Sequence, residues 1–100
     1  MKRLTAHKGV QTIVIFNGEG IPIRTSSREP SGAMSPLEPY AATLYPGLLQ
    51  PLVEKARKMI KTLDPGNEFQ TVRIRSVKNE LLVFPEKDYT LVVVQSAAAA

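Results

Sequence analysis

The sequence predicts one α+β domain in which five antiparallel strands pack with a long helix. Its 100 residues suit a single domain, because two halves would each have a core too small to be stable. Three observations give the fold class: a strand, turn and strand pattern over 10–25, a helical apolar pattern that ends at Leu63, and three short apolar runs near the C-terminus. The short turns between the last three runs force antiparallel neighbours.

The first quarter of the chain predicts a short helix and a hairpin. Residues 2–8 can form about two turns of helix that end at the following glycine. Val10 to Phe16 is rich in apolar β-branched residues, as is typical of an interior strand covered on both faces. Residues 17–20 supply the tight turn and 21–25 the return strand. Pro22 cannot donate a hydrogen bond within a sheet, so the return strand is expected at an edge or a bulge.

A proline- and serine-rich stretch follows the hairpin. Residues 26–39 hold many turn-forming residues and no apolar periodicity, which predicts a flexible connection. This insertion is expected to extend to residue 44, within a single domain that spans 1–96. Residues 97–100 are alanines without a pattern, and we expect a tail that need not be native.

A helix is predicted from Tyr45 to Leu63, because apolar residues recur there at three- and four-residue steps. The apolar positions are Leu48, Leu49, Leu52, Ala56, Met59, Ile60 and Leu63, and Lys55, Lys58 and Lys61 fall on the solvent side. A proline inside a helix costs about 3 kcal/mol, so Pro51 predicts that the regular helix starts near Gln50 or kinks there. The sequence Asp64-Pro65-Gly66-Asn67 predicts the end of the helix.

Three strands are predicted at 69–75, 80–84 and 89–95. Residues 91–94 are all apolar, which indicates a central strand. In the strand 69–75, polar and apolar residues alternate, as in a strand with one face in solvent. This strand is therefore a second candidate for a sheet edge.

Composition and charge argue against several partner classes. The net charge of +4 and the pI near 9.6 would suit a nucleic-acid-binding protein. However, the basic residues are dispersed and aromatic residues for base stacking are few, so no nucleic-acid partner is expected. No segment approaches the roughly 20 apolar residues of a membrane span, and the N-terminus lacks the apolar run of a signal peptide. The absence of cysteine excludes disulfides and favours an intracellular chain.

The candidate catalytic groups are weak. His7 is the single histidine, and a metal site without cysteine would need carboxylates from distant segments, so we expect an exposed helix residue. The glycine-bearing turn 17–20 lacks a phosphate-loop lysine and leads into a strand. Glu80, Glu86 and Asp88 could pair as acid and base, but we expect solvated loop charges. No catalytic, cofactor-binding or metal-binding residue is predicted.

Two pairs of residues suggest binding instead. Arg73 and Arg75 are two residues apart and so share one face of a strand. They either keep an exposed edge soluble or span a dimer and face a partner, and the sequence leaves both alternatives open. Ile21 and Ile23 flank the edge proline, where an extended or helical partner segment could lie.

A series of colinear blocks resembles the roadblock family of dynein light chains. The blocks are Lys8-Gly9-Val10, Asn17 with Glu19-Gly20-Ile21-Pro22-Ile23, Lys55-Ala56-Arg57, Asp64-Pro65, Arg73-Ile74-Arg75-Ser76, Lys78-Asn79-Glu80, Lys87-Asp88-Tyr89 and Gln95. The resemblance implies a five-stranded antiparallel sheet in the order 2-1-5-4-3, with a short N-terminal helix and one long helix on one face. It also implies a homodimer with a continuous ten-stranded sheet and no catalytic activity.

The resemblance further implies a role and a set of contact residues. The resemblance implies a light chain of the cytoplasmic or axonemal dynein motor that binds the dynein intermediate chain. Its location would be the cytoplasm and the microtubule cytoskeleton, or a cilium or flagellum for the axonemal motor. The dimer interface would comprise Leu48, Leu52, Ala56, Met59, Gln70, Thr71, Val72, Arg73, Ile74 and Arg75. Leu4, Lys8, Ile21, Ile23 and Arg24 are the candidates for partner binding. The alternative is a roadblock-type scaffold or regulator of a small Ras-like GTPase, a use known for other roadblock-type proteins.

Overall fold

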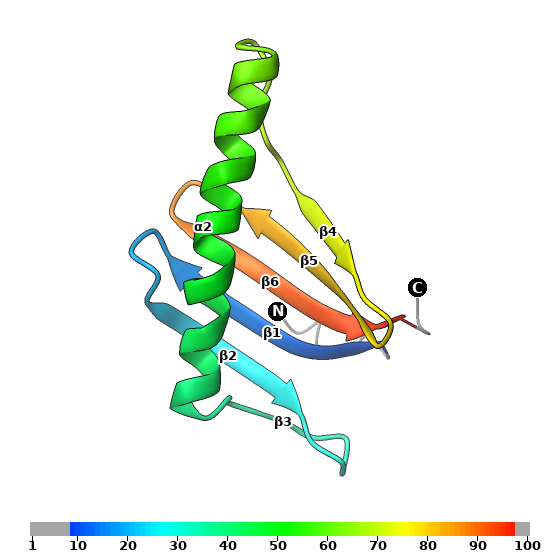
Figure 1. The fold of residues 1–100 in the computed structure, drawn as a ribbon. Helices are drawn as coiled ribbons and strands as arrows, with labels where there is room; N and C mark the ends of the chain where they lie inside the picture. Colours follow the sequence, from blue (N-terminus) through cyan, green and yellow to red (C-terminus); the bar gives the residue numbers. More distant parts are fainter. Residues whose placement is uncertain (1–8, 98–100) are drawn as a thin grey trace.

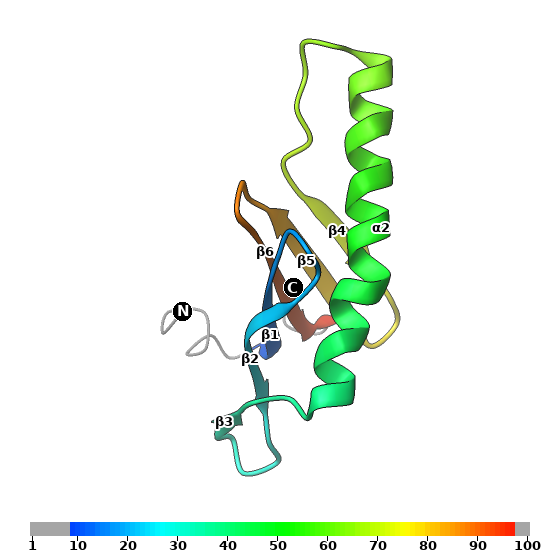
Figure 2. The ribbon, with the colours of Figure 1, turned by 90° about the vertical axis from the view of Figure 1, so that its left-hand side faces the viewer.

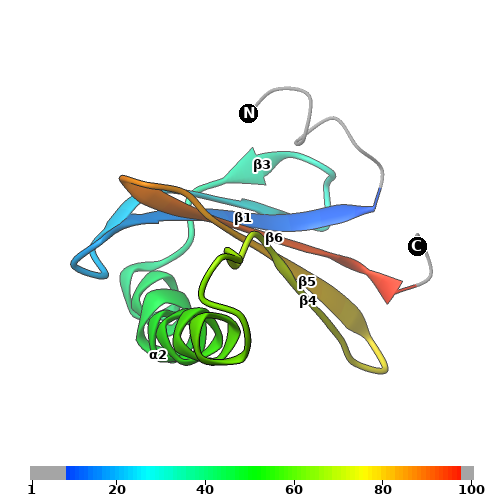
Figure 3. The same cartoon turned by 90° about the horizontal axis from the view of Figure 1, so that it is seen from above.

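The computed structural model describes residues 9–97, so the helix expected at 2–8 lies outside the described residues. The elements in chain order are β1 (Val10–Asn17), β2 (Pro22–Arg28), β3 (Met34–Ser35), α2 (Pro39–Leu63), β4 (Val72–Arg75), β5 (Asn79–Pro85) and β6 (Tyr89–Ser96). All strands belong to one antiparallel sheet, and α2 covers one of its faces (Figure 1, Figure 3).

The strand order is β3-β2-β1-β6-β5-β4. The order expected for five strands is confirmed, and β6 is a central strand between β1 and β5. The expected number of strands is wrong, because β3 adds a sixth beyond β2. The strand expected over 69–75 is also shorter, since residues 69–71 precede β4 without pairing to β5.

Pro22 lies where its missing N–H can be tolerated. It pairs with Phe16, and the β1–β2 register shifts between Ile15 and Phe16. The added strand β3 pairs only with Ser27 and Arg28, at the other end of β2. The start of β2 therefore remains a sheet edge next to an irregularity, as the proline predicts.

The stretch 26–44 differs from the flexible insertion that its composition predicts. β2 continues to Arg28, and a turn leads into β3, closed by a hydrogen bond from the Glu29 amide to the Ala33 carbonyl at 2.8 Å. The Arg28 guanidinium donates to the carbonyl of Val10 at 2.9 Å, and the Leu37 amide donates to Thr25 Oγ1 at 3.0 Å. These hydrogen bonds give regular structure to a sequence that has no apolar period.

Helix α2 begins at Pro39, so the expected start at Tyr45 or near Gln50 is wrong. The Glu38 side chain caps the helix by accepting a hydrogen bond from the Ala41 amide, and Pro39 occupies the first turn, where its missing N–H costs nothing. Pro46 and Pro51 both lie inside the helix. Its end at Asp64 agrees with the sequence prediction.

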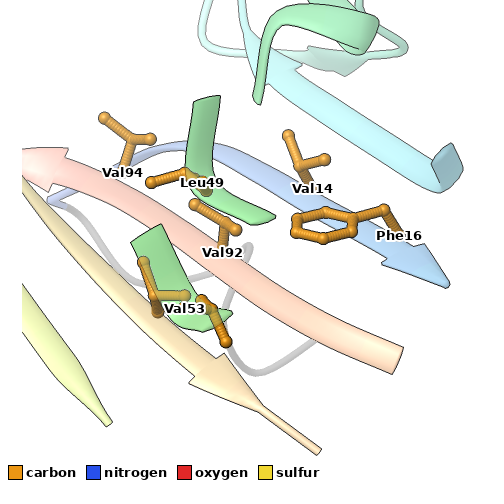
Figure 4. Packing of buried hydrophobic residues seen from close by; sticks show 7 residues of the cluster. Val14, Phe16, Leu49, Val53, Val92 and Val94 are labelled. Atoms are coloured by element: carbon orange, nitrogen blue, oxygen red, sulfur yellow. The ribbon is translucent and has the colours of Figure 1, made fainter. Parts of the chain in front are cut away.

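The core lies between α2 and the sheet. Val14 and Phe16 of β1 and Val92 and Val94 of β6 pack against Leu49 and Val53 of the helix (Figure 4). A second cluster, Val10, Ile13 and Val93, occupies the other face of the sheet, which we call the distal face. Burial of β1 on both faces is therefore confirmed. After Val53, α2 has no buried residue, and its C-terminal end extends beyond the strands (Figure 2).

Candidate functional site

Strand β4 forms a free edge of the sheet, because within the described residues it pairs with β5 alone. Val72 pairs with Val83 and Ile74 pairs with Leu81, and both partners belong to the core cluster under α2. Val72 and Ile74 therefore face α2. Ile74 is 38% exposed. A free edge with an exposed apolar side chain can accept a further strand.

The opposite side of β4 is charged. Arg73 pairs with Leu82 and Arg75 with Glu80, so both arginines lie on the distal face, as their spacing predicts. Glu80 is 1% exposed, which corrects the expectation of a solvated loop charge. Its carboxylate accepts from Arg73 Nε at 2.9 Å and from Gln95 Nε2 at 2.9 Å. These two partners make burial of the carboxylate possible.

Helix α2 leaves an apolar stripe uncovered. Its buried residues are Ala42, Pro46, Leu49 and Val53. A second row is exposed, and it consists of Tyr40, Leu44, Leu48, Leu52, Met59 and Leu63. We call this row the α2 stripe. Leu48 is 72% exposed and Leu63 is 76% exposed, which is unusual for large apolar side chains at helical spacing.

The α2 stripe lies on the flank of the helix that faces β4 and solvent. Gln50 and Glu54 line a cleft beside the β1–β2 and β5–β6 turns. Leu48 lies two residues before Gln50, and Leu52 lies two residues before Glu54. Each leucine is therefore about 200° around the helix axis from the residue that lines the cleft. Figure 1 shows these turns on one flank of α2 and β4 on the other. The stripe and Ile74 are therefore candidates for one continuous apolar surface.

The structure places most of the predicted dimer residues on these two elements. Leu48, Leu52 and Met59 belong to the α2 stripe, and Ala56 is half-buried beside it. Gln70 and Thr71 lie just before β4, and Thr71 Oγ1 donates to the Val83 carbonyl at 2.9 Å. Sequence reasoning missed Tyr40 and Leu44, because the helix was expected to begin later. Their four-residue spacing to Leu48 is the signal that could have identified them.

The predicted partner-binding residues lie elsewhere. Ile21 and Ile23 are exposed near the start of β2, and Arg24 is on the distal face opposite Ile15. Because β2 and β4 are separated by three strands, this group does not meet the β4 edge. The remaining candidates, Leu4 and Lys8, lie outside the described residues, as does His7.

The cleft beside α2 was not predicted. It has a volume of about 620 Å³ and lies between the helix, the two turns and the segment before β4. Val53, Phe69 and Tyr89 contribute apolar surface, and the charged groups around it include the Arg57–Glu54 ion pair at 3.3 Å. Acidic and basic side chains are both present, so the cleft has no single charge preference.

The described residues assemble no catalytic constellation. Glu80 is in β5 and far along the strand from Glu86 and Asp88 in the β5–β6 turn, so the three carboxylates do not converge. Between residues 9 and 97, no group of three His, Cys, Asp or Glu side chains is placed to hold a metal ion. In the same range, no helix has the length and hydrophobicity needed to cross a bilayer.

These features define a small α+β domain with a free sheet edge and an uncovered helix stripe. The family model of the Roadblock/LC7 domain matches residues 1–96. The chain therefore belongs to the Roadblock/LC7 family, which confirms the roadblock resemblance. The dynein light-chain type within that family is a finer assignment that this match leaves open.

Several similar solved structures come from bacteria. The Roadblock/LC7 domain from Streptomyces avermitilis aligns with a TM-score of 0.73 and 15% identity, covering 93% of this chain and 71% of that one. MglB from Myxococcus xanthus aligns with a TM-score of 0.72 and 18% identity, covering 98% of this chain and 68% of that one. The gliding protein MglB from Thermus thermophilus aligns with a TM-score of 0.64 and 18% identity, covering 96% of this chain and 68% of that one. Because these identities are low, the similarity shows a shared fold and not a shared function.

Proposed function

We propose that this chain is a non-catalytic adaptor that works as a homodimer. The observation that carries the proposal is the α2 stripe on the same flank as the free β4 edge. Pairing β4 with the β4 strand of a second copy would satisfy the unpaired backbone groups and join two sheets into one. It would also bring the two α2 helices together.

Burial of the α2 stripe supplies the driving force in this dimer. Fully burying one large apolar side chain contributes about 1.5–3 kcal/mol, and a two-fold axis uses each residue twice. The resulting platform presents two identical surfaces, so it can bind two copies of a partner. Such bivalent binding raises avidity by about 10² to 10⁴.

The first candidate partner is a small Ras-like GTPase. Similar solved structures include MglB and MglC of the bacterium Myxococcus xanthus. Scaffolding or regulation of a small Ras-like GTPase is a use of roadblock-type proteins that does not depend on the dynein motor. The comparisons support this candidate better than the dynein one.

The second candidate partner is the dynein intermediate chain. The blocks Arg73-Ile74-Arg75-Ser76, Lys78-Asn79-Glu80 and Lys87-Asp88-Tyr89 look like the dynein type of roadblock protein. The first two blocks form the β4 edge, the turn after it and the buried Glu80, and the third lies in the β5–β6 turn and at the start of β6. In this case the protein would act in the cytoplasm, in a microtubule-associated motor complex.

Two measurements test the proposal. Sedimentation at several protein concentrations should show a dimer, and monomers at all concentrations would contradict it. A pull-down with the tagged chain should then distinguish the partners. Recovery of a small GTPase without an intermediate chain supports the first candidate, and recovery of the intermediate chain without a GTPase supports the second.

A further inference from the structure

The distal face of β4 carries more positive than negative charge. Arg73 and Arg75 both lie on this face. Within residues 9–97, Glu80 forms an ion pair with Arg73, and no carboxylate forms one with Arg75. Arg75 Nη2 instead donates to the Ala97 carbonyl at 3.0 Å. Of the two guanidinium groups on this face, only that of Arg73 is therefore paired with a carboxylate within the described residues.

Dimerisation through β4 would concentrate this charge. In an antiparallel pair, residues opposite each other point to the same face. If the two-fold axis passes at Arg73, this residue lies opposite Arg73 of the partner subunit. If the axis passes at Ile74, Arg73 lies opposite Arg75 of the partner subunit. In both registers guanidinium groups of the two copies become neighbours, with Cβ atoms about 5 Å apart.

The seam between the two sheets would thus hold four arginines and two carboxylates, since each copy supplies Arg73, Arg75 and Glu80. Glu80 is already occupied by Arg73 and Gln95. Like charges directly opposite each other in a sheet are destabilising. An anionic group bound at the seam would remove this repulsion.

We propose that the four-arginine seam binds an acidic segment of the partner protein, with Asp or Glu carboxylates bridging the two copies. This inference rests on the proposed homodimer. Guanidinium groups bind carboxylates through two parallel hydrogen bonds, which suits a row of such groups. A nucleic acid would also be anionic, but neither β4 nor residues 80–83, which pair with it, contain an aromatic side chain for base stacking.

Binding at the seam has a thermodynamic consequence. The complete site exists only in the dimer, so an acidic segment that binds there stabilises the dimer by mass action. Dimerisation and binding of the segment are therefore positively coupled, and each must strengthen the other by the same factor. High salt should weaken the binding, because the interacting groups are charged and exposed to solvent.

The test uses the full chain and a fluorescein-labelled peptide of roughly ten glutamates, which is long enough to cross the seam. Fluorescence anisotropy should show binding that Arg75→Gln weakens about fivefold, the effect of losing an exposed charge pair. Lys58→Gln is the matched control, because it removes one positive charge from an exposed helix position. It should change the affinity less than twofold.

A second variant makes the opposite prediction. Glu80→Gln removes the carboxylate that competes for Arg73, so it should strengthen peptide binding, which a merely destabilised protein would not do. Circular dichroism confirms the fold of each variant.

Three results would overturn the inference. The first is an equal loss of peptide affinity in Arg75→Gln and Lys58→Gln. The second is that monomers bind the peptide as tightly as dimers do. The third is that a thymidine oligonucleotide of equal charge binds more tightly than the peptide. Sedimentation without peptide separates the two hypotheses. A dimer that does not bind the peptide overturns the acidic-segment site alone, whereas a monomer overturns the homodimer and the site together.

Discussion

At the scale of single residues, Gly20 shows how the β1–β2 turn is fixed to the helix. Gly20 has φ +81°, a conformation that side chains disfavour, and its amide donates to the Asn17 carbonyl at 3.0 Å. Gln50 of α2 donates from Nε2 to the Gly18 carbonyl at 2.5 Å. A Cβ atom on Gly20 would lie 2.6 Å from Gln50 Oε1.

Replacing Gly20 with alanine should therefore lower the free energy of unfolding by about 1–2 kcal/mol, the cost of a left-handed conformation with a Cβ atom. Urea unfolding measures the change. Gly18→Ala is the control, because nothing lies within 4 Å of a Cβ at Gly18. It should change stability by less than about 0.5 kcal/mol. Equal effects of the two variants would show that Gly20 has no special constraint.

Glu80 shows a limit of prediction at the same scale. In the sequence it is a carboxylate next to a turn, so a solvated charge is the ordinary interpretation. Its burial depends on Arg73 and Gln95, which approach it only through the strand pairings β4–β5 and β5–β6. By contrast, the shared face of Arg73 and Arg75 follows from the two-residue period of a strand and was predictable.

At the scale of secondary structure, α2 shows tertiary packing outweighing local propensity. Pro51 predicts a late start or a kink, yet the helix is continuous from Pro39 to Leu63 and contains Pro46 as well. Ala42 and Pro46 are buried, and their packing offsets the loss of hydrogen bonds. The Glu38-Pro39 pair at the N-terminus was a readable start signal, whereas the packing was not visible in the sequence.

The two prolines should respond differently to substitution. Pro51 is exposed, so Pro51→Ala restores a helix hydrogen bond without loss of packing. The free energy of unfolding should rise by about 2 kcal/mol. A proline in a helix costs about 3 kcal/mol, and its rigidity in the unfolded chain offsets up to about 1 kcal/mol of this cost. Pro46 is fully buried, so Pro46→Ala also removes core contacts. It should therefore raise the free energy of unfolding clearly less than Pro51→Ala does. Thermal unfolding of both variants checks this, and a larger gain at Pro46 would contradict it.

At the scale of the whole molecule, the resemblance to the roadblock family predicted the order of five strands and the helix-covered face, while the sequence pattern predicted the strands themselves. It missed β3, because two residues that pair with the end of β2 leave no periodic pattern. It also missed the cleft beside α2, whose lining comes from segments far apart in the chain. The free edge at β4 was predictable, since alternation of polar and apolar residues marks a strand with one face in solvent.

The proposed dimer gives the prediction at this scale. Ile74→Asp should weaken dimerisation about 100-fold, because each copy loses part of the roughly 1.5–3 kcal/mol of a full burial and a charge enters an apolar seam. Sedimentation measures the change. Val77→Asp is a matched control in the β4–β5 turn, where the side chain is 96% exposed, and it should leave the dimer unchanged. An intact dimer with Ile74→Asp would place the interface elsewhere.

The division of α2 into two sets of residues has an evolutionary consequence. Four buried side chains hold the helix on the sheet, while most of its remaining surface takes no part in folding. Mutations can therefore accumulate on that surface without unfolding the protein, and binding preferences can diverge while the architecture persists. This separation explains how this chain and bacterial proteins that are 15–20% identical to it can share one fold.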